Sequence, residues 1–90
     1  MKENYLTQKI KLDMKRAGWW TWKIKTSAND GIPDLLCIND GSYIFIEVKT
    51  EDGELSEIQK YIRGVLIKHG AKVFVVYGWQ DFLSQKKFFK

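Results

Sequence analysis

The chain is poor in the cysteine and histidine residues that form disulfides, zinc sites and nucleophilic relays in many small proteins. Its 90 residues include one cysteine, one histidine and one proline. The single Cys37 excludes an internal disulfide and a cysteine-rich zinc site, and its apolar neighbours indicate a buried small hydrophobic residue. The lone His69 has no second histidine for a zinc site or a nucleophilic relay, and its place before Gly70 is typical of a helix C-terminus.

Long hydrophobic stretches are also missing. No window approaches the roughly 20 apolar residues of a membrane-spanning helix, and residues 1–4 open a polar amphipathic stretch that does not resemble a signal peptide. A chain of this length is expected to form a single domain, 1–90, with a modest core that a partner subunit would help to stabilise. We therefore expect a cytoplasmic protein.

Basic residues outnumber acidic ones. The formal net charge is +4 and the isoelectric point is near 9.2. This balance favours a polyanionic partner such as nucleic acid. Charge alone does not identify that partner, because many proteins of similar charge bind no nucleic acid.

Hydrophobic periodicity and turn residues predict an alternation of helices and strands. The expected elements are a helix over 5–17, strands over 19–25, 35–38 and 43–49, a helix over 57–69, a strand over 73–77 and a short helix within 79–90. In the second helix Ser56 is the cap and Gln59 takes the capping-box position. The first three strands form an antiparallel meander, and the helix before the last strand allows that strand to run parallel to the third. The order predicts an α/β fold with a mixed four-stranded sheet flanked by helices.

The turn between the second and third strands places two acids together. If Asp40 and Gly41 form a two-residue turn, the numbers of opposed residues sum to 81, and Asp34 faces Glu47. Opposed side chains have Cβ atoms about 4.5–5.5 Å apart, and like charges there destabilise a sheet. A divalent cation between them would reverse that effect, and two carboxylates with a backbone carbonyl and waters suit Mg²⁺. Lys49 projects from the same face as Glu47.

These groups fit the hydrolysis of a phosphodiester bond. A metal ion would polarise the phosphoryl oxygen and lower the pKa of a bound water. Lys49 would orient or deprotonate that water, or stabilise charge on the phosphate, and the sequence leaves these roles open. The structural alternative is that Asp34 lies in a turn after Pro33 and that Glu47 and Lys49 form a salt bridge at a strand end.

Three motifs carry a family resemblance. They are Gly31-Ile32-Pro33-Asp34, Phe45-Ile46-Glu47-Val48-Lys49 and Leu55-Ser56-x-x-Gln59, and the N-terminal Glu3-x-x-Leu6 also matches. In this order they resemble the VRR-NUC branch of the PD-(D/E)xK nucleases, whose core is restriction-endonuclease-like, with the element order αβββαβ. The resemblance covers essentially the whole chain.

The resemblance implies a metal-dependent nuclease. It implies that Asp34, Glu47 and the carbonyl of Val48 bind Mg²⁺ or Mn²⁺, and that Lys49 is catalytic. It places Gln59 beside the site, where this role competes with the capping box for the same side chain. The N-terminal acid of the family falls on Glu3, which would otherwise only favour the start of a helix.

Stand-alone proteins similar to this one are phage or bacterial, form homodimers and cut branched DNA such as four-way junctions. We therefore expect a structure-selective endonuclease in a bacterial cell or a phage-infected host, with no small-molecule cofactor. The alternatives are a non-catalytic basic DNA-binding module with a relict nuclease fold, and a structural domain that binds a protein partner. The expected DNA contacts are Lys23, Lys25, Thr26, Ser27 and Asn29. The aromatic residues expected to supply either a dimer interface or simply the core are Trp19, Trp79, Phe82, Phe88 and Phe89.

Overall fold

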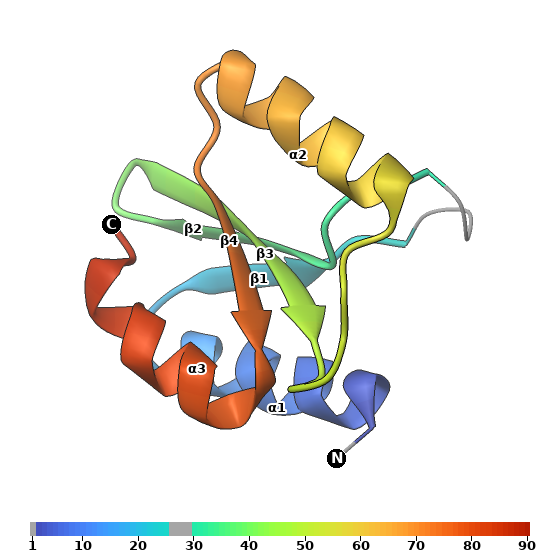
Figure 1. Cartoon of the computed structure of the whole chain (residues 1–90). Coiled ribbons are helices and arrows are strands. Elements are labelled where there is room, and N and C mark those ends of the chain that lie inside the picture. Colours follow the sequence, from blue (N-terminus) through green and yellow to red (C-terminus); the bar gives the residue numbers. More distant parts are fainter. Residues whose placement is uncertain (1, 26–29) are drawn as a thin grey trace.

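A computed structural model of the chain, in which residues 2–25 and 30–90 are described, has the predicted order of elements (Figure 1). The elements are α1 (Glu3–Arg16), β1 (Trp20–Lys23), β2 (Leu35–Asn39), β3 (Ser42–Lys49), α2 (Glu57–Lys68), β4 (Val73–Tyr77), α3 (Gly78–Gln85) and a 3-10 turn (Lys86–Phe88). The four strands form one sheet in the order β1-β2-β3-β4. β1, β2 and β3 are antiparallel neighbours, and β4 is parallel to β3. The predicted mixed α/β sheet is confirmed.

The hydrophobic core lies on one face of this sheet. Figure 1 shows α1 and α3 on that face and α2 on the other. The side chains of Ile44, Ile46 and Val48 in β3 are fully buried, and in α1 Ile10 and Met14 are buried with them. Side chains alternate along a strand, so Tyr43, Phe45, Glu47 and Lys49 lie on the opposite face, which we call the outer face. The remaining buried hydrophobic residues are Leu6, Leu35, Cys37, Val76, Phe82 and Phe89.

The β2–β3 hairpin has the predicted register. Asn39 pairs with Ser42, and the pairing continues to Leu35 and Ile46. The turn residues Asp40 and Gly41 have φ angles of 50° and 80°. Two consecutive residues in the left-handed region are the signature of the type I′ turn, whose twist matches that of the strands it joins. This local turn chemistry fixes the alignment of every residue along the hairpin.

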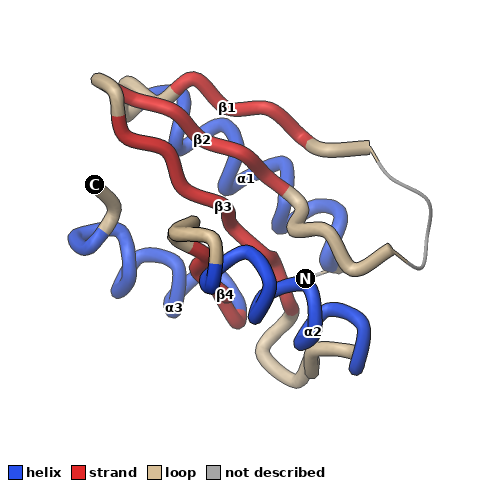
Figure 2. Tube along the Cα trace, turned by 90° about the horizontal axis from the view of Figure 1, so that it is seen from above, coloured by secondary structure: helices blue, strands red, loops and turns tan. Residues whose placement is uncertain are grey.

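The first strand is shorter than predicted, and the structure shows which of its two faces is buried. β1 ends at Lys23, and its buried side chain is Thr21, whereas Trp20 and Trp22 are 54% and 56% exposed. β1 is an edge strand that α1 covers on the Thr21 side only. Figure 2 shows β1 lying over α1, with α2 towards the other edge of the sheet near β4. Among residues 2–25 and 30–90, no helix therefore lies over the tryptophan side of β1.

None of the apolar residues of the second helix is buried. In α2 Tyr61 is 66% exposed and Ile58 and Ile67 are exposed as well. The helix packs against β4 rather than across the sheet, so its apolar side meets only a narrow part of the outer face. Among the residues that the structure describes, no helix is long and apolar enough to cross a membrane.

Most of the aromatic residues named as a possible interface belong to the core. Phe82 and Phe89 are buried, and Trp19 and Trp79 pack against the core cluster. The rings of Phe82 and Trp79 lie 5.2 Å apart between their centroids. Only Phe88 is largely exposed, at 62%. The core interpretation is therefore confirmed for Phe82 and Phe89, because α3 and the tail fold back onto the sheet, and Trp19 and Trp79 are partly buried against the same core.

Candidate active site

The hairpin register brings Asp34 and Glu47 together. Asp34 directly precedes β2, and its neighbour Leu35 pairs with Ile46. The backbone N–H of Val48 donates to Asp34 Oδ2 at 2.7 Å, and the N–H of Ile24 donates to the Asp34 carbonyl at 2.8 Å. Asp34 is thus fixed from both neighbouring strands, with its carboxylate bonded to the backbone beside Glu47.

Glu47 and Lys49 are buried charged groups. Their exposed fractions are 4% and 9%, although both lie on the outer face. Burial, the hydrogen bond to Asp34 and the negative charge of Asp34 together raise the pKa of the Glu47 carboxyl to about 9, against a lowering by Lys49. Without a cation the Glu47 carboxyl therefore keeps its proton at neutral pH.

The salt bridge between Glu47 and Lys49 that the structural alternative requires does not form. Within the described part of the chain, direct ion pairs join Lys60 to Glu57 and Lys86 to Asp13, and none joins Glu47 to Lys49. A simple strand-end ion pair therefore does not explain why two charged side chains are buried here, and the structural alternative loses its main support.

The donor set suits a hard divalent cation. Among residues 2–25 and 30–90, no three His, Cys, Asp or Glu side chains gather closely enough to hold a metal ion by themselves. Mg²⁺ usually takes only one or two carboxylates and keeps several waters, so the Asp34–Glu47 pair fits such an ion. The raised pKa of Glu47 also indicates that the negative charge of this carboxyl is poorly stabilised at the same place. The predicted ligand role of the Val48 carbonyl stays a prediction.

Gln59 forms the capping box at the start of α2. The Ser56 N–H donates to Gln59 Oε1 at 2.8 Å, and the Gln59 N–H donates to Ser56 Oγ at 3.2 Å. The capping role is confirmed, and it occupies the amide oxygen of the side chain. Of the two competing roles, the one beside the acids stays a prediction for the amide nitrogen.

Glu3 lies at the start of α1, and the predicted DNA contacts Lys23 and Lys25 lie at the end of β1 and just after it. Glu3 is the first residue of α1 and is exposed, and its charge contributes to the raised pKa of Glu47. Lys23 Nζ donates to Asn4 Oδ1 at 3.1 Å, and Lys25 is exposed just after β1. The remaining predicted contacts, Thr26, Ser27 and Asn29, lie outside the described residues.

Gly31 locks the loop before Asp34 against α2. Its φ is +74°, and a Cβ at this position would lie 2.6 Å from the backbone oxygen of Ile58. Only glycine allows this approach without strain. The contact holds the Asp34 loop and the first turn of α2 together, so that Gln59 and Asp34 are positioned by the same packing. The sequence motif contained Gly31, but its partner could not be read from it.

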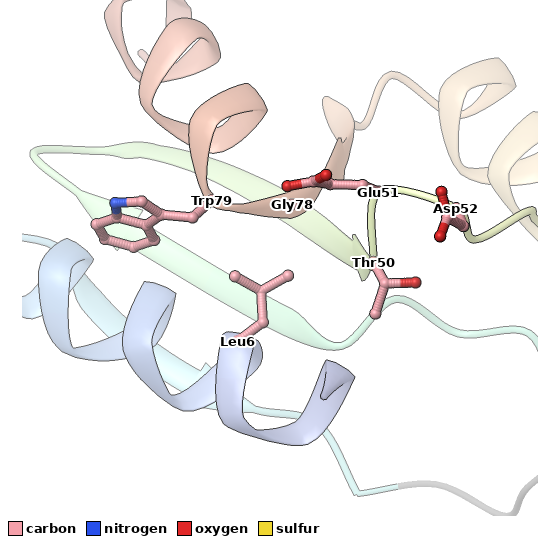
Figure 3. Close-up of a pocket in the computed structure, with 6 residues that line it drawn as sticks. All are labelled: Leu6, Thr50, Glu51, Asp52, Gly78 and Trp79. Carbon is pink, nitrogen blue, oxygen red and sulfur yellow. The ribbon is translucent and has the colours of Figure 1, made fainter. Parts of the chain in front are cut away.

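A cavity of about 370 Å³ lies beyond the end of β3. It is lined by Leu6, Thr50, Glu51, Asp52, Gly78 and Trp79 (Figure 3). Thr50 directly follows Lys49, yet none of the predicted site residues lines the cavity. Apart from Leu6, the lining residues carried no motif in the sequence, because three separate segments meet here only in the fold.

Comparison with known proteins identifies the family. The model of the VRR-NUC domain matches residues 6–80. A solved structure described as a VRR_NUC domain has a TM-score of 0.86 and 26% identity, covering 98% of this chain and 97% of that one. No curated protein matches the chain. Because the family model spans most of the sequence and the structural match spans nearly all of it, this chain belongs to the VRR-NUC family of nuclease domains.

Proposed function

We propose that this nuclease domain is a metal-dependent DNA endonuclease whose reaction centre is Asp34, Glu47 and Lys49. The observation that carries the proposal is the burial of Glu47 against Asp34, with a pKa raised to about 9. Burying two acids side by side is unfavourable for folding, and cation binding explains why the pair is there. Perturbed carboxyls of this kind cluster at functional sites.

The protein groups have distinct roles in this proposal. Asp34, Glu47 and the Val48 carbonyl would hold Mg²⁺ or Mn²⁺, and the bound ion supplies Lewis-acid polarisation of the phosphate and a more acidic water. The Val48 N–H orients the Asp34 carboxylate. Lys49 is buried beside the pair, where low polarity strengthens its attraction for charge developing on the phosphate. Its ammonium group thereby stabilises the transition state or positions the attacking water.

Two further residues complete the centre. The Gln59 amide oxygen is used by the capping box, so its N–H groups are the part that would donate to substrate or water. Glu3 acts from the start of α1, where its charge already reaches Glu47. Both assignments follow the family pattern.

We propose that the substrate is branched DNA and that the protein acts as a homodimer. Each chain carries one acid pair, and symmetric cutting of a four-way junction needs two, which a two-fold dimer provides. The exposed apolar residues Ile58 and Tyr61, three positions apart on one side of α2, offer a surface on which a second copy can pack. Lys23 and Lys25, with Thr26, Ser27 and Asn29, are proposed to hold the DNA backbone.

Cleavage of a DNA panel in Mg²⁺ or Mn²⁺ tests this function. Linear, flap, splayed and four-way substrates are incubated with the wild-type chain, Glu47→Ala, and the matched control Glu54→Ala, which removes an exposed acid of the same charge. We expect Glu47→Ala to lose cleavage while keeping DNA binding in Ca²⁺, and Glu54→Ala to cut normally. A wild-type chain that binds DNA but leaves every substrate intact would support the non-catalytic DNA-binding module.

A further inference from the structure

The outer face carries an exposed aromatic pair close to the acid pair. The rings of Trp20 and Trp22 are stacked, with centroids 5.8 Å apart and planes only 7° from parallel. Each residue is more than half exposed. A large apolar pair that is exposed on a small soluble domain marks a binding surface more often than a lone exposed residue does. Each ring braces the other, so little rotamer freedom is lost when a flat ligand stacks on the pair.

Strand pairing places this aromatic pair beside the acids. Trp22 pairs with Leu36, and Asp34 lies two residues before Leu36, so all three share the outer face. Two residues along a strand and one strand across amount to about 8 Å between the Cα atoms of Trp22 and Asp34. That distance is roughly two nucleotides of stacked DNA at about 3.4 Å each.

A basic hollow lies along the same sheet edge, between α1 and β1. It has a volume of about 440 Å³ and is lined by Gln8, Lys11, Trp22, Lys23 and Lys25. A smaller hollow shares Gln8 and Lys11 and continues to Lys15 of α1. In the described part of the chain no carboxylate forms an ion pair with any of these lysines, and Lys23 bonds only a neutral amide oxygen, Asn4 Oδ1. The positive charge of the hollow is therefore available to an anionic ligand.

We infer that the Trp20–Trp22 stack and this basic hollow bind a DNA strand with unpaired bases, within a few nucleotides of the cut phosphodiester bond. The inference rests on the proposed function and names the substrate feature that the centre selects. Lysines along the hollow hold the phosphates, while an unpaired base stacks on the tryptophans. A base inside a duplex has both faces covered by its neighbours and cannot do so. Lysine is depleted in protein–protein interfaces, so the lysine rim favours DNA over a second protein chain as the occupant.

Binding measurements in Ca²⁺ test the inference. Two labelled DNAs are compared, a fully paired duplex and the same duplex with a short unpaired bulge. We expect Trp22→Ala to weaken binding of the bulged DNA by roughly 5- to 150-fold, the range for loss of one stacked base, and to leave duplex binding nearly unchanged. Trp22→Phe, which keeps a ring, should retain most of the binding. The matched control Phe88→Ala removes an equally exposed ring near the C-terminus and should change neither affinity.

The lysines have their own test. Lys11→Ala should weaken both DNAs to the same extent and lower the salt dependence of binding by about one unit of slope, whereas Lys68→Ala, an exposed lysine at the end of α2, should not. Loss of binding to both DNAs on Trp22→Ala, or no loss at all, would overturn the base-stacking inference. Conversion of a dimer to a monomer by Trp22→Ala in sedimentation would overturn it in favour of a protein interface. If instead the wild-type chain binds and cuts no DNA, the proposed function itself fails.

Discussion

Replacing Glu47 by glutamine should stabilise the metal-free protein at neutral and alkaline pH. The wild-type carboxyl keeps its proton in the folded chain up to a pKa of about 9, because burial and Asp34 disfavour its charge, whereas its ordinary value is 4.5. Glutamine has the same shape and is neutral at every pH. Glu47→Gln therefore removes a titration that opposes folding, while preserving the packing beside Asp34.

The sign and size of the effect follow from linkage. A carboxyl whose pKa is raised on folding stabilises the native state fully below pH 4.5, and this stability is lost as the pH rises from 4.5 towards 9. At about 1.36 kcal/mol per pH unit, the loss between pH 4.5 and pH 7 is at most about 3 kcal/mol. Such a loss is a large fraction of the stability of a small domain.

Urea denaturation in EDTA at several pH values from 5 to 9 measures the difference. The free energy of unfolding of the wild-type chain should fall with pH relative to that of Glu47→Gln, and all other titrating groups cancel in the comparison. Adding Mg²⁺ should restore stability to the wild-type chain at high pH but not to the variant. Parallel pH profiles for the two proteins in EDTA would refute the raised pKa of Glu47. They would also refute the argument that the charged acid pair needs a cation.

Four further substitutions separate chemistry from folding. Lys49→Ala should lower the cleavage rate by roughly 10²-fold or more and keep metal affinity, so that calorimetry showing lost metal binding would contradict its role. Gly31→Ala should destabilise the chain by about 1–3 kcal/mol in urea denaturation, because its Cβ meets the Ile58 backbone; unchanged stability would mean that the contact does not form. Ser56→Ala should cost about 1 kcal/mol of stability with normal cleavage, whereas Gln59→Ala should lose both; equal cleavage by the two variants would limit Gln59 to capping.

The acid pair could be predicted from the sequence because it depends on local chemistry. Asp40 and Gly41 specify a type I′ turn, and the turn sets the register along the whole hairpin. Asp34 and Glu47 then follow by counting. The capping box at Ser56 and Gln59 was predictable for the same reason, since both partners lie within one helical turn.

The environment of the other elements depends on distant packing and could not be predicted. Alternation in β1 shows two faces but not which of them α1 covers, and the buried side is that of Thr21 rather than Trp22. Tyr61 of α2 stays exposed, because among the strands this helix packs mainly against β4. The sequence left Phe82 and Phe89 open between a dimer interface and the core, and only the fold places them in the core.

The strand that carries Glu47 and Lys49, β3, is held both by its buried core face and by pairing along both edges. Ile46 and Val48 are fully buried on the core face, and they alternate with Glu47 and Lys49 on the outer face. The backbone of β3 is paired on both sides, by β2 and β4. Side chains on such a strand have little freedom to separate or to reach solvent, so the repulsion between Glu47 and Asp34 cannot be relieved by movement. It must be relieved by a proton or by a cation, so binding of the proposed cation would release the proton.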